Sequence, residues 1–267
     1  MYAFNVERPA TLKDAVALLG KDSEAKLLAG GHSLIPVMKL RLANPSMLID
    51  LSKIAELSGV KVEGDTVTIG ATTTHQMVAN SKELLAAMPA LAAVPASIGD
   101  PHVRQAGTIG GSVANNDPNA DYPAACLALG ATIITSKRKI EADAYFKGMF
   151  ETALGADEII TAISFPVTKT ANYQKFKHPA SGFALVGVFV AKGKSGVRVA
   201  VTGAGANGVF RVKAFEDALS KDFSAKAIEN IKVPADGLNT DIHAPADYRA
   251  HLIGVLAKRA VMAAAKG

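Results

Sequence analysis

Two glycine-rich stretches, AGGHS at Ala29–Ser33 and TIGGS at Thr108–Ser112, lie about a third of the chain apart. Each contains an adjacent glycine pair beside a hydroxyl-bearing residue. Adjacent glycines can adopt left-handed backbone conformations and approach a ligand closely, so that successive amide groups face an anion. One such stretch is common in an ordinary turn. Two of them in one domain predict a pocket that holds a diphosphate group from both sides.

The residues around the first stretch predict a strand–glycine turn–helix–strand unit. A short strand at residues 26–28 runs directly into the glycines, and a second strand follows at residues 47–51. Between them, Pro36 fits the first turn of a helix that continues to Leu42. A helix that begins just after the glycines places its partial positive charge where a phosphate would lie, and Ser33 can donate its hydroxyl there.

The residues around the second stretch predict a mixture of strands and helices. A hairpin is expected at residues 61–69, and an alanine- and leucine-rich run at residues 81–98 is expected to be helical. A helix at residues 122–129 and a strand at residues 158–165 follow. This part of the chain is therefore expected to form its own sheet covered by helices.

The character of the sequence changes near residue 170. Residues 183–190 are almost continuously apolar, and residues 197–205 have the pattern of a neighbouring strand. Helices are predicted after these strands, at residues 213–219, 225–231 and 248–265. Strands followed by helices predict a separate α+β layer. The expected division is into residues 1–170, with subdomains at 1–54 and 55–170, and residues 171–267.

The composition excludes several classes of protein. The chain has 267 residues, of which 49% are hydrophobic and 20% are charged, and its net charge is +5. The share of charged residues, 20%, is low and leaves room for a buried subunit interface. The lysines and arginines are scattered, with no basic run interleaved with aromatic residues, so we expect no nucleic-acid partner.

The single cysteine also limits the chemistry. Cys126 excludes an internal disulfide and fits a reducing compartment. A [2Fe–2S] cluster normally takes four cysteine thiolates, so this chain cannot hold one alone. Cys126 lies in an apolar run and is expected to be a core residue. The amino terminus lacks the pattern of a signal peptide, and no apolar run approaches the length of a membrane span, so a cytoplasmic location is expected.

A resemblance to a known family extends over nearly the whole chain, from Phe4 to the segment at residues 247–261. Its most specific parts are residues 29–54, 69–78 and 99–133. Together they resemble the FAD-binding medium subunit of molybdenum hydroxylases, a group that includes carbon monoxide dehydrogenase, xanthine dehydrogenase and nicotine dehydrogenase. The resemblance implies an α+β fold. A two-subdomain FAD-binding domain of the vanillyl-alcohol oxidase-like (PCMH) type would precede a small antiparallel sheet with helices.

The resemblance also implies a function and partners. The chain would carry non-covalent FAD as an electron-transfer subunit, without a catalytic side chain or a metal of its own. It would take electrons from [2Fe–2S] clusters on a small subunit and pass them to an external acceptor, while a large subunit holds molybdopterin. The assembly would be a dimer of such heterotrimers. A free-standing FAD oxidase and a flavin-free assembly protein remain as alternatives.

The resemblance implies the cofactor contacts residue by residue. They are Leu28, Ala29, Gly30, Gly31, His32, Ser33, Leu34, Thr108, Ile109, Gly110, Gly111, Ser112, Asn115, Asp121, Ile160, Lys177 and Phe183. The last three rest on resemblance alone. The imidazole ring of His32 is expected to donate a hydrogen bond near the cofactor rather than to attach the cofactor covalently.

Three sites have competing interpretations. Asp121 can accept hydrogen bonds from ribityl or ribose hydroxyls, or it can cap the helix that follows. Phe183 can lie against the isoalloxazine ring or in the core. The segment Gly203–Gly208 matches the dinucleotide pattern G-x-G-x-x-G, but residues unsuited to a helix start follow it, so we interpret it as a turn.

Overall fold

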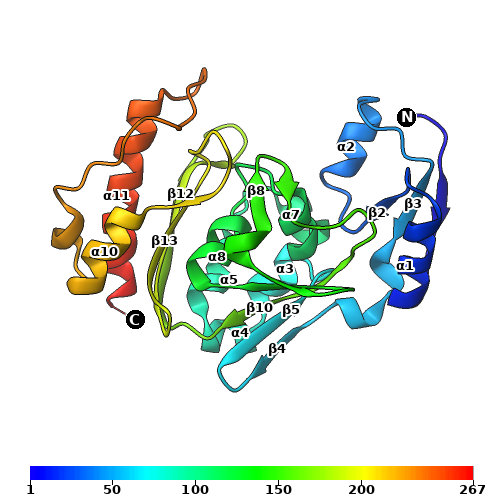
Figure 1. The fold of residues 1–267 in the computed structure, drawn as a ribbon, viewed down its shortest axis with the longest axis horizontal. Helices are drawn as coiled ribbons and strands as arrows, with labels where there is room; N and C mark the ends of the chain where they lie inside the picture. Colours follow the sequence, from blue (N-terminus) through cyan, green and yellow to red (C-terminus); the bar gives the residue numbers. More distant parts are fainter. Residues whose placement is uncertain (267) are drawn as a thin grey trace.

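The computed structural model describes residues 1–266 as an α+β protein with four sheets (Figure 1). The first unit lies at the opposite end of the molecule from the C-terminal helices. Its elements are β1 (Asn5–Glu7), α1 (Leu12–Lys21), β2 (Lys26–Leu28), α2 (Leu34–Lys39), β3 (Met47–Asp50), η1 (Leu51–Lys53) and η2 (Ala55–Leu57). Its three strands are parallel, in the order β1-β3-β2. The predicted strand–glycine turn–helix–strand unit is therefore present.

The helix after the first glycine stretch differs from its predicted bounds. It begins at Leu34 and ends at Lys39, so Pro36 lies within it and Leu42 lies outside it. The chain leaves the helix because Arg41 takes a left-handed conformation with φ of +60°. Leu42, which was expected to extend the helix, is consequently 75% exposed.

The middle unit is built on a five-stranded sheet in the order β4-β5-β10-β6-β7. Its strands are β4 (Val60–Glu63), β5 (Thr66–Gly70), β6 (Thr132–Thr135), β7 (Lys139–Glu141) and β10 (Ile160–Pro166), with a separate hairpin of β8 (Phe146–Gly148) and β9 (Glu151–Thr152). Its helices are α3 (His75–Asn80), α4 (Lys82–Ala87), α5 (Pro89–Ala96), α6 (Pro101–Ala106), α7 (Ile109–Asn115), α8 (Tyr122–Leu129) and α9 (Ala142–Tyr145). The run at residues 81–98, which was expected to be helical, forms two helices, because Pro89 forces the preceding Met88 out of helical geometry.

The third unit is an antiparallel sheet in the order β11-β12-β13-β14 with helices that follow it in the chain. Its elements are β11 (Thr170–Lys177), β12 (Ala184–Gly193), β13 (Gly196–Thr202), β14 (Phe210–Arg211), α10 (Lys213–Lys221), η3 (Ala225–Ile228) and α11 (Ala246–Ala264). The helix predicted at residues 225–231 is only the 3-10 turn η3, whose cap is the Ser224 side chain.

Both faces of this sheet are covered, which explains the continuous apolar sequence of β12 (Figure 1). Helices α10 and α11 pack on one face, and α5 and α8 pack on the other. Val188 and Val190 belong to the core under α11, whereas Phe189 and Ala191 belong to the core of the middle unit. A strand buried on both faces has no need of polar alternation. The sheet therefore holds the middle unit and the C-terminal helices together.

Candidate cofactor-binding site

A cavity of about 680 Å³ opens between the first unit and the middle unit. Both glycine stretches line it, and the β11–β12 loop contributes Ser181, Gly182 and Phe183 to its wall. Ligand sites for small molecules and cofactors have volumes of roughly 300–1,000 Å³, so this cavity can take a large ligand. The two stretches predicted to act together are thus brought to one site from different parts of the fold.

The first glycine stretch needs its two glycines for different reasons. Gly31 has φ of +72°, a left-handed conformation that side chains disfavour. Gly30 has no such conformation, but a Cβ placed on it would overlap the carbonyl oxygen of Ala106 and lie 2.6 Å from the Cα atom of Gly107. The prediction of positive φ is therefore confirmed at Gly31 and wrong at Gly30. The close approach made by Gly30 is to the segment that enters the second stretch.

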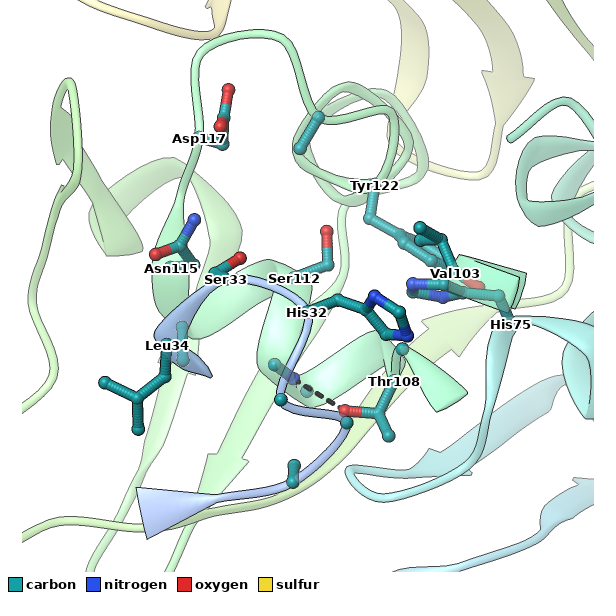
Figure 2. Close-up of a pocket in the computed structure, with 18 of the residues that line it drawn as sticks. His32, Ser33, Leu34, His75, Val103, Thr108, Ser112, Asn115, Asp117 and Tyr122 are labelled. Carbon is teal, nitrogen blue, oxygen red and sulfur yellow. Dashed lines mark hydrogen bonds between the residues drawn. The ribbon is translucent and has the colours of Figure 1, made fainter. Parts of the chain in front are cut away.

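The second glycine stretch is the first turn of helix α7 rather than a left-handed turn, which corrects the sequence interpretation. Thr108 caps this helix, and its Oγ1 atom accepts the N–H of Gly111 at 3.1 Å (Figure 2). Gly110 faces the interior, where an added Cβ would lie 2.6 Å from the Cβ atom of Ala71. A Cβ on Gly111 would meet only the Thr108 hydroxyl, at 3.0 Å. Gly111 therefore keeps the cavity side of the helix start open.

Asp121 does not cap helix α8, so that alternative is wrong. It occupies the cap position without a side-chain capping bond. Its carboxylate instead accepts hydrogen bonds from the Tyr173 hydroxyl at 2.5 Å and from Lys175 Nζ at 2.9 Å. The Asp121 and Lys175 side chains are 5% and 4% exposed, which makes this a buried ion pair. Burial raises the pKa of Asp121, and the neighbouring Lys175 opposes that rise.

Most of the predicted contact residues line the cavity. They are Leu28, Ala29, Gly30, Gly31, His32, Ser33, Leu34, Thr108, Gly110, Gly111, Ser112, Asn115, Asp121, Ile160 and Phe183. Ile109 does not line it, because its side chain is fully buried in the core below α7. Lys177 does not line it either: it is exposed and follows a register irregularity between Phe176 and Lys177. The lysine of strand β11 that lines the cavity is Lys175.

The sequence interpretation missed several polar residues of the cavity wall, and two of them are buried histidine and tyrosine side chains. His75, the first residue of α3, and Tyr122, the first residue of α8, both line the cavity. The Nδ1 atom of His75 and the hydroxyl of Tyr122 are buried without a hydrogen-bond partner. Burial, with a smaller effect of His32, lowers the pKa of His75 to about 4. Figure 2 shows the ring of His32 turned toward His75. His75 lies within residues 69–78, one of the most specific parts of the family resemblance, but that resemblance implied no cofactor contact for it.

The other open alternatives are decided by burial and backbone geometry. Phe183 is 53% exposed and lines the cavity, so the interpretation as a core residue is wrong. The segment Gly203–Gly208 forms turns that lead to β14, and no helix begins there, which confirms the turn interpretation. Cys126 is fully buried, and burial raises the pKa of its thiol, as expected of a core residue.

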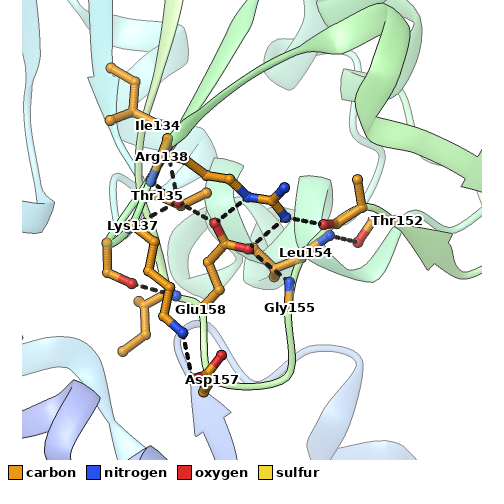
Figure 3. Close-up of polar contacts among 12 residues, drawn as sticks. Ile134, Thr135, Lys137, Arg138, Thr152, Leu154, Gly155, Asp157 and Glu158 are labelled. Atoms are coloured by element: carbon orange, nitrogen blue, oxygen red, sulfur yellow. Dashed lines mark hydrogen bonds and ion pairs between the residues drawn. The ribbon is translucent and has the colours of Figure 1, made fainter.

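A network around Glu158 fixes the loop that leads to Ile160 (Figure 3). The Glu158 carboxylate accepts hydrogen bonds from the Arg138 guanidinium, from the Thr135 hydroxyl and from the N–H of Gly155. Arg138 also donates to the carbonyl oxygen of Ala153 at 2.7 Å. Arg138 first, and the other donors after it, lower the pKa of Glu158 from 4.5 to about 2.

Glu158→Gln is expected to remove about 2 kcal/mol of stability at neutral pH, after allowance for the half-exposed Arg138. Because the pKa is lowered on folding, the stabilisation is complete above the unfolded value of 4.5 and is lost as the pH falls toward 2. Urea unfolding across this range should show a shallower pH dependence in the variant. Glu63→Gln, which breaks an exposed ion pair with Lys61, is the matched control and should leave the dependence unchanged.

Two further searches concern residues 1–266. No group of three or more His, Cys, Asp or Glu side chains in this range is arranged to hold a metal ion. None of the helices described there is long and apolar enough to cross a membrane.

The family model for the FAD binding domain in molybdopterin dehydrogenase matches residues 2–168. The carbon monoxide dehydrogenase medium chain of Hydrogenophaga pseudoflava is 37% identical, over 98% of this chain and 96% of the relative. The nicotine 6-hydroxylase medium subunit of Paenarthrobacter nicotinovorans is 35% identical, over 98% and 97%.

Solved structures of related enzymes superpose on nearly the full length of this chain. Carbon monoxide dehydrogenase from Hydrogenophaga pseudoflava, in a form that lacks the Mo-pyranopterin moiety, superposes with a TM-score of 0.89 at 37% identity, covering 99% of this chain and 98% of that one. Quinoline 2-oxidoreductase from Pseudomonas putida 86 superposes with a TM-score of 0.89 at 28% identity, covering 100% and 98%. The chain therefore belongs to the family of FAD-binding medium subunits of molybdenum hydroxylases.

Proposed function

We propose that this chain is the flavin relay of a three-subunit molybdenum hydroxylase. It would accept electrons from [2Fe–2S] clusters of a small subunit and pass them to an external acceptor. A large molybdopterin subunit would oxidise the substrate, and two heterotrimers would form the assembly. The supporting observation is the cavity held between two glycine stretches, in a chain whose relatives are medium chains of such dehydrogenases over almost their whole length.

The residues of the cavity fit FAD. Gly111 leaves open space at the capped start of α7, where an anionic diphosphate can lie against the partial positive charge of the helix start, while the N–H groups of residues 109–112 donate to acceptors within the protein. Ile160 and Phe183 supply apolar wall for a flat ring, and the buried, unpartnered Tyr122 hydroxyl can pair with a polar atom of the cofactor. A buried polar atom without a partner costs about 1–3 kcal/mol, so a ligand that pairs with it is favoured.

Each part of the site has a defined task in this proposal. The two glycine stretches hold the diphosphate without covalent attachment at His32. Asp121 orients hydroxyl groups of the cofactor, and Lys175 favours the charged form of that carboxylate and places a positive charge at the cavity wall. FAD supplies the redox chemistry, since a flavin exchanges electrons singly or in pairs, and the protein orients and tunes it. No side chain of the site has to act as a general acid or base.

The partners and location follow from the same sequence features. The sequence has one cysteine, so an iron–sulfur cluster has to lie on another polypeptide. We infer a cytoplasmic location from the free thiol of Cys126. We also propose that residues 1–170 form the FAD-binding domain and that residues 171–267 form a separate domain. The experiment that tests the relay is anaerobic reduction of the bound flavin by substrate, with and without the other subunits.

Phe183→Ala is expected to change the flavin and not the stability of the fold. Because the ring is 53% exposed, its removal should cost less than about 1 kcal/mol, far below the cost of emptying a core position. If the ring contacts the isoalloxazine, the reduction potential or the fluorescence of bound FAD should shift. Urea unfolding and a spectroscopic redox titration measure the two effects. A large loss of stability with unaltered flavin properties would contradict this assignment.

A further inference from the structure

The β11–β12 loop of the cavity wall, His178–Phe183, closes on itself. The N–H of His178 donates to the carbonyl oxygen of Phe183 at 2.8 Å, and the N–H of Gly182 donates to the carbonyl oxygen of His178 at 2.9 Å. Gly182 has φ of +70°, which lets the chain turn back toward β12. Ser181, Gly182 and Phe183 form part of the cavity wall. The conformation of this loop therefore decides where the Phe183 ring lies.

The imidazole of His178 makes contacts on both of its nitrogens. Its Nδ1 atom accepts the N–H groups of Ala180 and Ser181, each at 3.3 Å. A nitrogen that accepts hydrogen bonds carries no proton, so the proton of this ring resides on Nε2. The Nε2 atom lies 3.0 Å from Nδ1 of His243, to which it donates. The direction of the backbone contacts thus assigns the tautomer of His178 and makes His243 the acceptor.

His243 is itself held by the turn that precedes α11. Its N–H donates to Oδ1 of Asp241 at 2.9 Å, and Oδ2 of Asp241 accepts a hydrogen bond from Arg249 at 2.7 Å. Arg249 is only 2% exposed and also donates to the carbonyl oxygens of Leu185 and Gly203. The acceptor of the His178 ring is therefore anchored to the interior of the third unit.

The same loop touches the middle unit on its other side. A Cβ on Gly182 would lie 3.2 Å from the Cα atom of Gly99, so the two backbones pass in close contact. Gly99 belongs to the connection between α5 and α6, which also lines the cavity. Arg104 holds that connection through the carbonyl oxygens of Ile98 and Gly99. The loop thus spans from the anchored His243 to the middle unit at one end of the cavity.

We propose that His178 and His243 form a hydrogen-bonded tether that fixes the His178–Phe183 loop and thereby sets the position of Phe183 at the cofactor. They are positioning residues, and neither lines the cavity. The part of this inference that concerns the flavin rests on the proposed function, whereas the tether rests on the contacts alone. Without the tether, the loop opens more often and exposes the bound flavin to solvent.

The test uses His243→Ala and His243→Asn in the full chain. Alanine removes the acceptor, whereas the asparagine amide can place an oxygen close to the position of Nδ1. Hydrogen exchange of the FAD-free protein should show faster exchange at Gly182 in the alanine variant, by about three- to tenfold, the range for one neutral hydrogen bond. In the FAD-bound protein, iodide quenching of flavin fluorescence should rise about twofold or more for the same reason. The asparagine variant should behave as wild type.

The exposed His251 of α11 supplies the control, and His251→Ala should change neither measurement. Unchanged exchange at Gly182 in His243→Ala would overturn the tether. Equal effects of alanine and asparagine would overturn the hydrogen bond as its basis, because the two rings also pack with centroids 4.3 Å apart. Faster exchange with unchanged iodide quenching would overturn the link to the flavin. If wild type binds no FAD, the proposed function fails, while the exchange measurement still decides the tether.

Discussion

Gly111→Val is expected to abolish measurable FAD binding while the fold remains intact. A Cβ at this position meets only the Thr108 hydroxyl at 3.0 Å, so the added branches extend into the cavity rather than into the protein. Overpacking a fitted site costs about 1–3 kcal/mol or more, which corresponds to a loss of affinity of roughly 5- to 150-fold at least. Equilibrium dialysis with FAD measures the affinity, and urea unfolding measures the stability.

Gly254→Val is the matched control. Gly254 lies in helix α11, a Cβ there meets nothing within 4 Å, and valine brings the same helical penalty. This variant should keep FAD. Gly30→Val should differ from both, because its side chain would overlap the backbone at Ala106 and destabilise the protein as well as its site. Full flavin occupancy in Gly111→Val would contradict the placement of the diphosphate at the start of α7.

Lys175→Met is expected to be the most destabilising single change at the site. It leaves the Asp121 carboxylate buried with only the Tyr173 hydroxyl as a side-chain partner. Breaking a buried ion pair by removing one charge costs about 3–5 kcal/mol. The double variant Lys175→Met with Asp121→Asn should recover most of this loss, since replacing both members of a buried pair is often close to neutral. Urea unfolding of the FAD-free protein compares both variants with wild type.

FAD binding should respond differently from stability in this series. Lys175→Met and the double variant both lack the positive charge that Lys175 places at the cavity wall, so both should bind FAD more weakly than wild type. The double variant should regain stability, but its FAD affinity should stay low because the Lys175 charge is still absent. A double variant as unstable as Lys175→Met would show that the ion pair is not what stabilises this part of the cavity. The exposed Lys177 provides a control, and Lys177→Met should retain near-normal stability.

The two sides of the cavity could be predicted because each is formed by a short continuous stretch of sequence. The Ala29–Ser33 stretch follows its strand directly, and Gly31 requires a conformation that only its own residue type adopts easily. The Thr108–Ser112 stretch was correctly predicted to line the cavity, but its predicted left-handed backbone conformation was wrong. A glycine pair in the first turn of a helix has the same sequence as a glycine pair in a left-handed turn. The feature that distinguishes the helix here is Thr108, which caps α7.

Other features depend on contacts between distant residues and could not be predicted. Lys175 and Lys177 are two residues apart on one strand, so the strand period of two assigns them to the same face. The irregularity at Phe176 and Lys177 separates them, and it arises from pairing with β12. In the same way, Asp121 caps no helix because its partners, Tyr173 and Lys175, come from a strand 52 and 54 positions away.

The most direct test of the electron-relay assignment is flavin bleaching under anaerobic conditions. The isolated chain, loaded with FAD, is mixed with the substrate of the complex, and absorbance of the oxidised flavin is followed. We expect no bleaching in the isolated chain, because in the proposed relay the substrate is oxidised on the molybdopterin subunit. Addition of the iron–sulfur and molybdopterin subunits should then bleach the flavin. Bleaching by substrate in the isolated chain would contradict the relay and favour a free-standing oxidase.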